Sequence, residues 1–192
     1  SRSSEKNIVA LFRRFYRYAI DIDNVCGYRE HLISLIGNNR NHTRNVYFLD
    51  IGFAPGGMSR LLLDAHENIY GVGITLPPYE SGNVYVSELL SNRRYVCREH
   101  DIVALAKKVK HRWDFMRECL GNDYSTQNAS SLSPVWRTEF AGFDLVIVGI
   151  TCHEDRSDAE RVNVLHQIWL SELYIAFLTL CDGGSVLIRH YV

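Results

Sequence analysis

The sequence lacks the cysteine spacing that marks a disulfide framework or a zinc site. Its five cysteines are odd in number and scattered, and none forms a C-x-x-C pair: Cys26, Cys97, Cys119, Cys152 and Cys181. A reducing compartment is the default for such usage. We therefore expect an intracellular protein, cytoplasmic or nuclear, that holds no metal ion.

Long hydrophobic runs and a charge excess of either sign are also missing. The chain has no uninterrupted run of about 18 apolar residues and no signal-peptide pattern, so we expect no membrane contact. Its formal net charge is −1 and its pI is about 6.7. Because the overall field offers phosphate groups little attraction, RNA binding would depend on a local basic patch.

What the sequence does contain is an alternation of strand-like and helix-like segments. At 192 residues, 46% of them hydrophobic, the chain suits one average domain with a sizeable core. Apolar, β-branched runs predict strands near residues 46–51, 69–75, 94–99, 143–150 and 185–191. A long helix is expected over residues 159–180, ended by the segment 182–184. The alternation predicts an α/β fold, a Rossmann-like doubly wound parallel sheet flanked by helices.

Two helices are expected before the first strand. Apolar residues recur at helical spacing from Asn7 to about Ile36, with an interruption near Gly27. A polar segment, residues 37–44, is typical of a linker. We therefore divide the chain into an N-terminal helical extension and linker, residues 1–44, and a sheet domain, residues 45–192.

The first of these helices carries arginines beside tyrosines, away from its apolar stripe: Arg13, Arg14, Arg17, Tyr16 and Tyr18. Such a face could contact phosphates and stack bases of RNA. A solvated basic face on a packing helix is the commoner arrangement, and the sequence leaves both interpretations open.

The stretch from Asp50 to Gly57 contains the most specific pattern in the chain. A strand-like run enters the small-residue turn D-I-G-F-A-P-G-G, and a helix-like segment follows. Such a turn lets the backbone approach a ligand closely, because glycine and alanine side chains do not obstruct it. As a dinucleotide fingerprint it is imperfect, since Gly52, Ala54 and Gly57 give G-x-A-x-x-G. The alternative, that the glycines serve only the geometry of the turn, stays open.

This D-x-G-x-A-P-G-G pattern resembles the first motif of the FtsJ-like methyltransferases, which bind S-adenosylmethionine and typically methylate a ribose 2′-hydroxyl of RNA. Later segments resemble further motifs of the family in the expected order, so the resemblance covers roughly residues 45–192. It implies S-adenosylmethionine as the cofactor. The residues that it implies for the cofactor site are Asp50, Gly52, Phe53, Ala54, Pro55, Gly56, Gly57, Thr75, Asp101 and Ile102.

Two of these residues are informative about the nucleoside. By resemblance to the family's G-x-D-L motif, Thr75 stands at the position of an acid that accepts hydrogen bonds from the ribose. Thr75 can make one neutral hydrogen bond, so we expect weaker cofactor binding than an acid would allow. Asp101 matches the family's H-D-I or G-D-I motif, in which the carboxylate accepts a hydrogen bond from the adenine amino group. Capping the following helix is an equally sensible role for Asp101, and the two roles can coexist.

The resemblance also implies a catalytic tetrad, from which this chain departs at every position. Gly149 stands where the family's F-D-x-V-x-x-D motif has a catalytic Asp, and Arg189 stands for a catalytic Lys. The first Lys has no convincing match and the final acid would lie past Val192, so we expect a domain truncated at its C-terminus. A guanidinium stays protonated, so Arg189, the candidate catalytic residue, could orient a substrate but hardly act as a base. Polar residues that could substitute follow Gly149: Cys152, His153, Glu154, Asp155 and Asp158.

Two functional interpretations follow from the sequence. In the first, the chain is an S-adenosylmethionine-dependent methyltransferase with altered catalytic residues, acting on RNA ribose or on a small-molecule acceptor. In the second, it is a catalytically inactive FtsJ-like domain that serves as a cofactor-binding or structural module. The motif loop favours cofactor binding, whereas Thr75, Gly149 and Arg189 argue against the family's chemistry.

Overall fold

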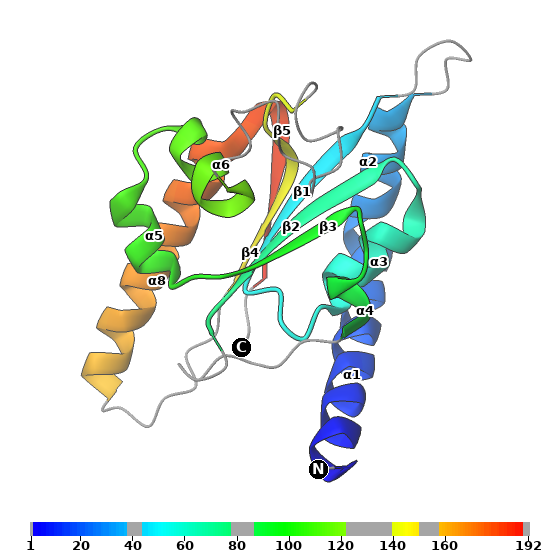
Figure 1. Cartoon of the computed structure of the whole chain (residues 1–192), viewed down its shortest axis with the longest axis horizontal. Helices are drawn as coiled ribbons and strands as arrows, with labels where there is room; N and C mark the ends of the chain where they lie inside the picture. The colour runs from blue at the N-terminus through cyan, green and yellow to red at the C-terminus, as the bar shows by residue number, and fades with distance from the viewer. Residues whose placement is uncertain (1, 38–43, 78–86, 122–139, 150–157, 190–192) are drawn as a thin grey trace.

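A five-stranded parallel sheet forms the centre of the protein (Figure 1). The computed structural model describes residues 2–37, 44–77, 87–121, 140–149 and 158–189. The strands are β1 (Val46–Ile51), β2 (Ile69–Thr75), β3 (Tyr95–Glu99), β4 (Phe143–Val148) and β5 (Leu180–Ile188). Their order is β3-β2-β1-β4-β5, and every neighbouring pair is parallel. The predicted doubly wound α/β fold is confirmed.

Helices cover both faces of the sheet (Figure 1). One layer holds α1 (Arg2–Cys26), α2 (Tyr28–Ile36), α3 (Gly57–Ala65) and α4 (Ser87–Leu90); the other holds α5 (Ile102–Lys108), α6 (Arg112–Leu120) and α8 (Asp158–Thr179). Each layer packs on the sheet through its own buried cluster, with Phe48 and Leu62 in the first and Val146 and Phe115 in the second. Within the described ranges, none of the helices has the length and apolar character to cross a membrane.

β1 lies at the centre of the sheet. All six residues of β1 are buried, as its near-continuous apolar run predicts for the middle of a parallel sheet. The strand pairs with β2 on one side and with β4 on the other. The winding direction of the chain reverses between β1 and β4. The carboxyl ends of these two strands therefore form the topological switch point, the place where open α/β sheets commonly bind ligands.

The two N-terminal helices lie where the sequence predicts them and pack directly on the sheet's first helix. Gly27, with a φ of 64°, separates α1 from α2. Ala19 and Leu32 from these helices share a buried cluster with Met58 of α3. Residues of α1 and α2 therefore belong to the core that supports the β1–α3 connection.

The junction between α8 and β5 differs from the prediction. The strand begins at Leu180, so the segment 182–184 lies inside β5 rather than ending the helix. Pairing with β4 is irregular between Leu180 and Ser185, which makes this segment a bulge. Gly183, with a φ of 79°, permits the excursion. The glycines thus indicate a strand bulge, and β5 starts earlier than predicted.

Candidate functional site

The candidate site is the carboxyl edge of the sheet, where the loop between β1 and α3 crosses the switch point. The loop is bound to β2, because the N–H groups of Gly52 and Phe53 both donate to the carbonyl oxygen of Ile74, at 2.7 and 3.3 Å. Gly56, with a φ of 106°, precedes the first turn of α3. The D-x-G-x-A-P-G-G stretch is therefore strand, turn and helix start, as the sequence predicts.

The protein itself packs closely on this loop. Phe53 is 2% exposed, and its ring lies edge-on to that of Tyr95. A Cβ atom at Gly56 would overlap the side chain of Leu89, and one at Gly57 would overlap the backbone nitrogen of Tyr16 in α1. The packing of the protein itself therefore requires small residues at Gly56 and Gly57. Enlarging Gly56 would disturb the fold along with any bound molecule, so it is not a clean test of binding.

Asp50, the acid that opens the motif, is fully buried within a hydrogen-bond network. Its Oδ2 accepts a hydrogen bond from Ser59 Oγ at 2.7 Å, and that Oγ lies 2.6 Å from the hydroxyl of Tyr95. Burial raises the pKa of Asp50, and the nearby positive charge of Arg189 opposes the rise. Burial also raises the pKa of Tyr95 well above its ordinary value, so the phenol stays protonated.

Arg189 reaches from the end of β5 to the end of β1. Its Nη2 donates to Asp50 Oδ1 at 3.2 Å, to the carbonyl oxygen of Ile51 at 2.8 Å and to that of Gly52 at 3.4 Å. The residue is only 7% exposed. Within the described part of the chain, its Nε has no hydrogen-bond partner. The candidate catalytic residue is therefore a buried cation that lies against the first residue of the motif loop.

Gly149 leaves room for this arginine. A Cβ atom at Gly149 would overlap the carbonyl oxygen of Arg189 and lie 2.7 Å from its Cβ, and the φ of 139° disfavours any side chain there. The N–H of Gly149 donates to Oε1 of Glu172, a fully buried carboxylate of α8, at 3.2 Å. Glu172 is not among the residues that the sequence predicts for the site. A carboxylate on an otherwise apolar helix face is nevertheless a recognisable signal, because acids are rarely buried without a polar role.

Thr75, Asp101 and Ile102 lie farther along the same edge. Asp101 caps α5, because its Oδ1 accepts hydrogen bonds from two backbone N–H groups of the first turn, at 2.7 and 3.4 Å. The capping role of Asp101 is therefore confirmed. Thr75 is buried and pairs in register with Glu99, the last residue of β3. Glu99, which the sequence does not predict for the site, thus places a carboxylate beside the position where the FtsJ-like pattern has its ribose-binding acid.

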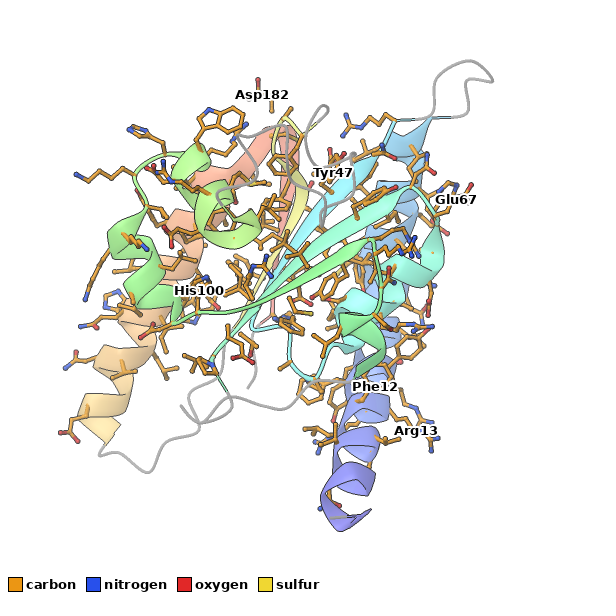
Figure 2. All side chains as sticks on the ribbon, viewed as in Figure 1. Phe12, Arg13, Tyr47, Glu67, His100 and Asp182 are labelled. Carbon is orange, nitrogen blue, oxygen red and sulfur yellow. The ribbon has the colours of Figure 1, made fainter. Side chains whose placement is uncertain are left out.

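A cavity of about 530 Å³ lies at the other edge of the sheet, lined by residues that include Tyr47, Arg112, Asp144 and Asp182. Figure 2 labels Tyr47 and Asp182 near this amino edge, and His100 near the carboxyl edge. The guanidinium of Arg112 donates to backbone carbonyl oxygens, and Arg44 forms an ion pair with Asp144. Both arginines are therefore engaged by the protein. The carboxyl edge remains the candidate site, because ligands of parallel sheets collect there.

The basic face of α1 is solvent-exposed in part. Arg13, Arg14 and Arg17 are exposed, and Figure 2 shows Arg13 projecting from the helix. Tyr16 instead packs against the core, and the guanidinium of Arg14 lies over the ring of Tyr18 at 5.4 Å. The face thus offers charge and the exposed ring of Tyr18, whereas Tyr16 is engaged by the core.

The polar residues expected to substitute for the family's acid lie outside the described residues, apart from Asp158. These are Cys152, His153, Glu154 and Asp155. Asp158 is the first residue of α8.

Comparisons with known proteins leave the family open. No protein-family profile and no curated protein matches the chain. A solved structure that aligns with it is CalO1, a methyltransferase in calicheamicin biosynthesis in its SAH-bound form. The alignment covers 87% of this chain and 36% of CalO1, with 14% sequence identity and a TM-score of 0.35. A likeness of this degree assigns no function, and the fold rests on the strand order described above.

Proposed function

We propose that this chain is an FtsJ-like domain that binds an S-adenosyl nucleoside at the carboxyl edge of its sheet. The observation that carries the proposal is the D-x-G-x-A-P-G-G turn at the topological switch point. S-adenosylmethionine is the cofactor that the motif implies. The same edge of the sheet carries Thr75, Asp101 and Ile102, the other residues of the motif-implied cofactor site.

In this proposal the adenine lies at the end of β3 and the ribose at the end of β2. Both cap bonds of Asp101 use Oδ1, so its Oδ2 would accept the adenine amino group. Thr75 would face the ribose hydroxyls with a single neutral hydroxyl. Because the loop side chains are buried, its backbone would make the contacts to the amino-acid end of the ligand.

The chemistry of ribose methylation has little support at this edge. Removing the hydroxyl proton requires a group that can take it, and Arg189 stays protonated at any workable pH. Gly149 offers no acid and is crowded by Arg189. We therefore propose that the domain binds the nucleoside without methylating RNA ribose through the family's tetrad.

A second candidate function is methyl transfer with a relocated acid, and the position of Glu172 favours it. This carboxylate is buried at the end of β4, next to the position of the family's catalytic Asp. Incubation with labelled S-adenosylmethionine and a panel of RNA and small-molecule acceptors separates the two candidates. Transfer that is lost in Glu172→Gln would establish the second. The first candidate, nucleoside binding without catalysis, requires methyl transfer at background levels.

Calorimetric titration tests nucleoside binding itself, with variants that separate capping from adenine contact. Asp101→Ser keeps an oxygen that can cap α5 but removes the second carboxylate oxygen. We expect it to weaken S-adenosylhomocysteine binding about 10-fold or more, with the melting temperature nearly unchanged. Asp114→Ser, at an acid in the first turn of α6, is the matched control and should bind like wild type. No binding by the wild-type protein would overturn the proposed function.

A further inference from the structure

The end of β3 carries an acid close to the place where the proposed nucleoside lies. Glu99 is the last residue of β3, and it pairs in register with Thr75, the last residue of β2. The pairing of the two strands continues to the carboxyl edge, because the N–H of His100 donates to the carbonyl oxygen of Thr75 at 2.9 Å. Glu99 is exposed, whereas Thr75 is buried. The backbone of Glu99 is therefore fixed at the edge, and its side chain is accessible to a ligand.

Glu99 and Thr75 both lie on the face of the sheet that carries the motif loop. A Cβ atom at Gly73 would lie 2.7 Å from the ring of Phe53, so this position of β2 faces the loop. In β3, Cys97 packs against the buried cluster that contains Phe53. Alternate residues of a strand share one face. Thr75 and Glu99, each two residues farther along, therefore lie on the same loop face.

A carboxylate at this place has the chemistry that a ribose requires. The two ribose hydroxyl groups are neighbouring donors, and one carboxylate can accept hydrogen bonds from both. In dinucleotide-binding α/β sheets, an acid that follows the glycine turn has this function. Neighbouring strands lie about 4.8 Å apart, a distance that a glutamate side chain can span. An ionised carboxylate has two acceptor oxygens, so Glu99 can keep a contact with the protein and still accept a ligand hydroxyl.

We infer that Glu99, on the neighbouring strand, takes the place of the acid that β2 lacks and binds the ribose hydroxyls of the adenosyl ligand; the inference rests on the adenosyl binding proposed above. Asp101 receives the adenine and Glu99 the ribose, so the end of β3 recognises both parts of adenosine. Thr75 adds one neutral hydrogen bond. The site therefore selects ligands that carry both ribose hydroxyls.

The test is calorimetric titration with S-adenosylhomocysteine and with its 2′,3′-dideoxy analogue, which lacks both hydroxyls. Wild type should bind the analogue at least about tenfold more weakly, because hydrogen bonds to a charged group are lost. Glu99→Ala should bind S-adenosylhomocysteine at least about tenfold more weakly than wild type does, and should distinguish the two ligands by about threefold or less. Glu67→Ala removes an exposed acid near the amino edge (Figure 2) and is the matched control, which should behave like wild type.

A rescue variant separates a contact with the ribose from an indirect effect on the fold. Glu99 is an exposed residue at a strand end, so Glu99→Ala should leave the melting temperature nearly unchanged. Thr75→Asp in the Glu99→Ala background returns an acid to β2. This double variant should recover most of the preference for the ligand that carries the hydroxyls.

The failures of the two proposals look different in this experiment. An unchanged preference for the hydroxyls in Glu99→Ala would overturn the inference and leave Glu99 as a solvated charge on an edge strand. Equal binding of both ligands by wild type would also overturn it, because the site then does not recognise the hydroxyls. Binding of neither ligand by wild type would instead overturn the adenosyl site itself.

Discussion

Placing the family's acid at position 149 should destabilise this protein rather than restore chemistry. In Gly149→Asp, the new Cβ would overlap the carbonyl oxygen of Arg189 and lie 2.7 Å from its Cβ. The neighbour cannot easily move, because the Arg189 N–H donates to the carbonyl oxygen of Val148 at 2.8 Å and its guanidinium holds Ile51. The φ of 139° at Gly149 adds backbone strain.

The expected loss of stability has two causes, the backbone strain and the steric overlap. A side chain in a backbone region reserved for glycine costs about 1–3 kcal/mol. Overpacking of a rigid site costs about 1–3 kcal/mol more. The free energy of unfolding of Gly149→Asp should therefore fall by about 2–6 kcal/mol, a large part of the about 5–15 kcal/mol typical of a domain. Urea denaturation followed by circular dichroism measures this change.

Two control variants separate the backbone strain from the steric overlap with Arg189. Gly149→Ala tests the Cβ without the carboxylate and should account for most of the loss. Gly183→Ala shares the positive φ, at 79°, but its Cβ would meet nothing within 4 Å. It should cost only the backbone strain, about 1–2 kcal/mol. Equal losses in Gly183→Ala and Gly149→Ala would refute the argument that Arg189 occupies the space beside Gly149.

Three further predictions concern the buried charges, the α1 contact and the thiols. Arg189→Met should lower the free energy of unfolding by about 3–5 kcal/mol, because it leaves Asp50 buried without its cation. Adding Asp50→Asn should recover part of the lost stability. Additive losses in this double-mutant cycle would contradict the ion pair. Gly57→Ala should cost about 1–3 kcal/mol and speed amide hydrogen exchange in α1, because its Cβ would overlap α1 backbone; unchanged exchange would contradict that contact. Burial raises the pKa of Cys97 to about 12. The reactive thiolate therefore forms only as the pH approaches that value, so at pH ~8 iodoacetamide should modify exposed Cys26 and spare Cys97; equal rates by mass spectrometry would refute this.

Much of the fold could be predicted because its strands are short, buried and strongly patterned. The predicted limits of β1 and β2 agree with the structure, and β3 begins one residue later than predicted, at Tyr95. The predicted start of β5 was wrong, because a glycine after a helix-like run can either end the helix or permit a strand bulge. Local pattern does not distinguish these cases, since the bulge at Gly183 depends on pairing with β4.

The candidate site was less predictable because its main contact is long-range. Asp50 and Arg189 are 139 positions apart, and no local pattern links them. An acid in the apolar run of β1 does indicate a need for a buried partner, but the sequence does not say which. The same holds for Glu172, whose contact with Gly149 depends on how α8 packs against β4. Asp101 was predictable in its capping role because that role is local.

The most direct test of the account is to locate the bound nucleoside by NMR. Titration of nitrogen-15-labelled protein with S-adenosylhomocysteine should shift the backbone amide signals of residues 52–54, of Gly56 and Gly57, and of Ile102, at the carboxyl edge. Signals of Tyr47 and Cys181, beside the cavity at the amino edge, should stay in place. Shifts confined to the amino edge, or no shifts at saturating nucleoside, would contradict an adenosyl site at the switch point.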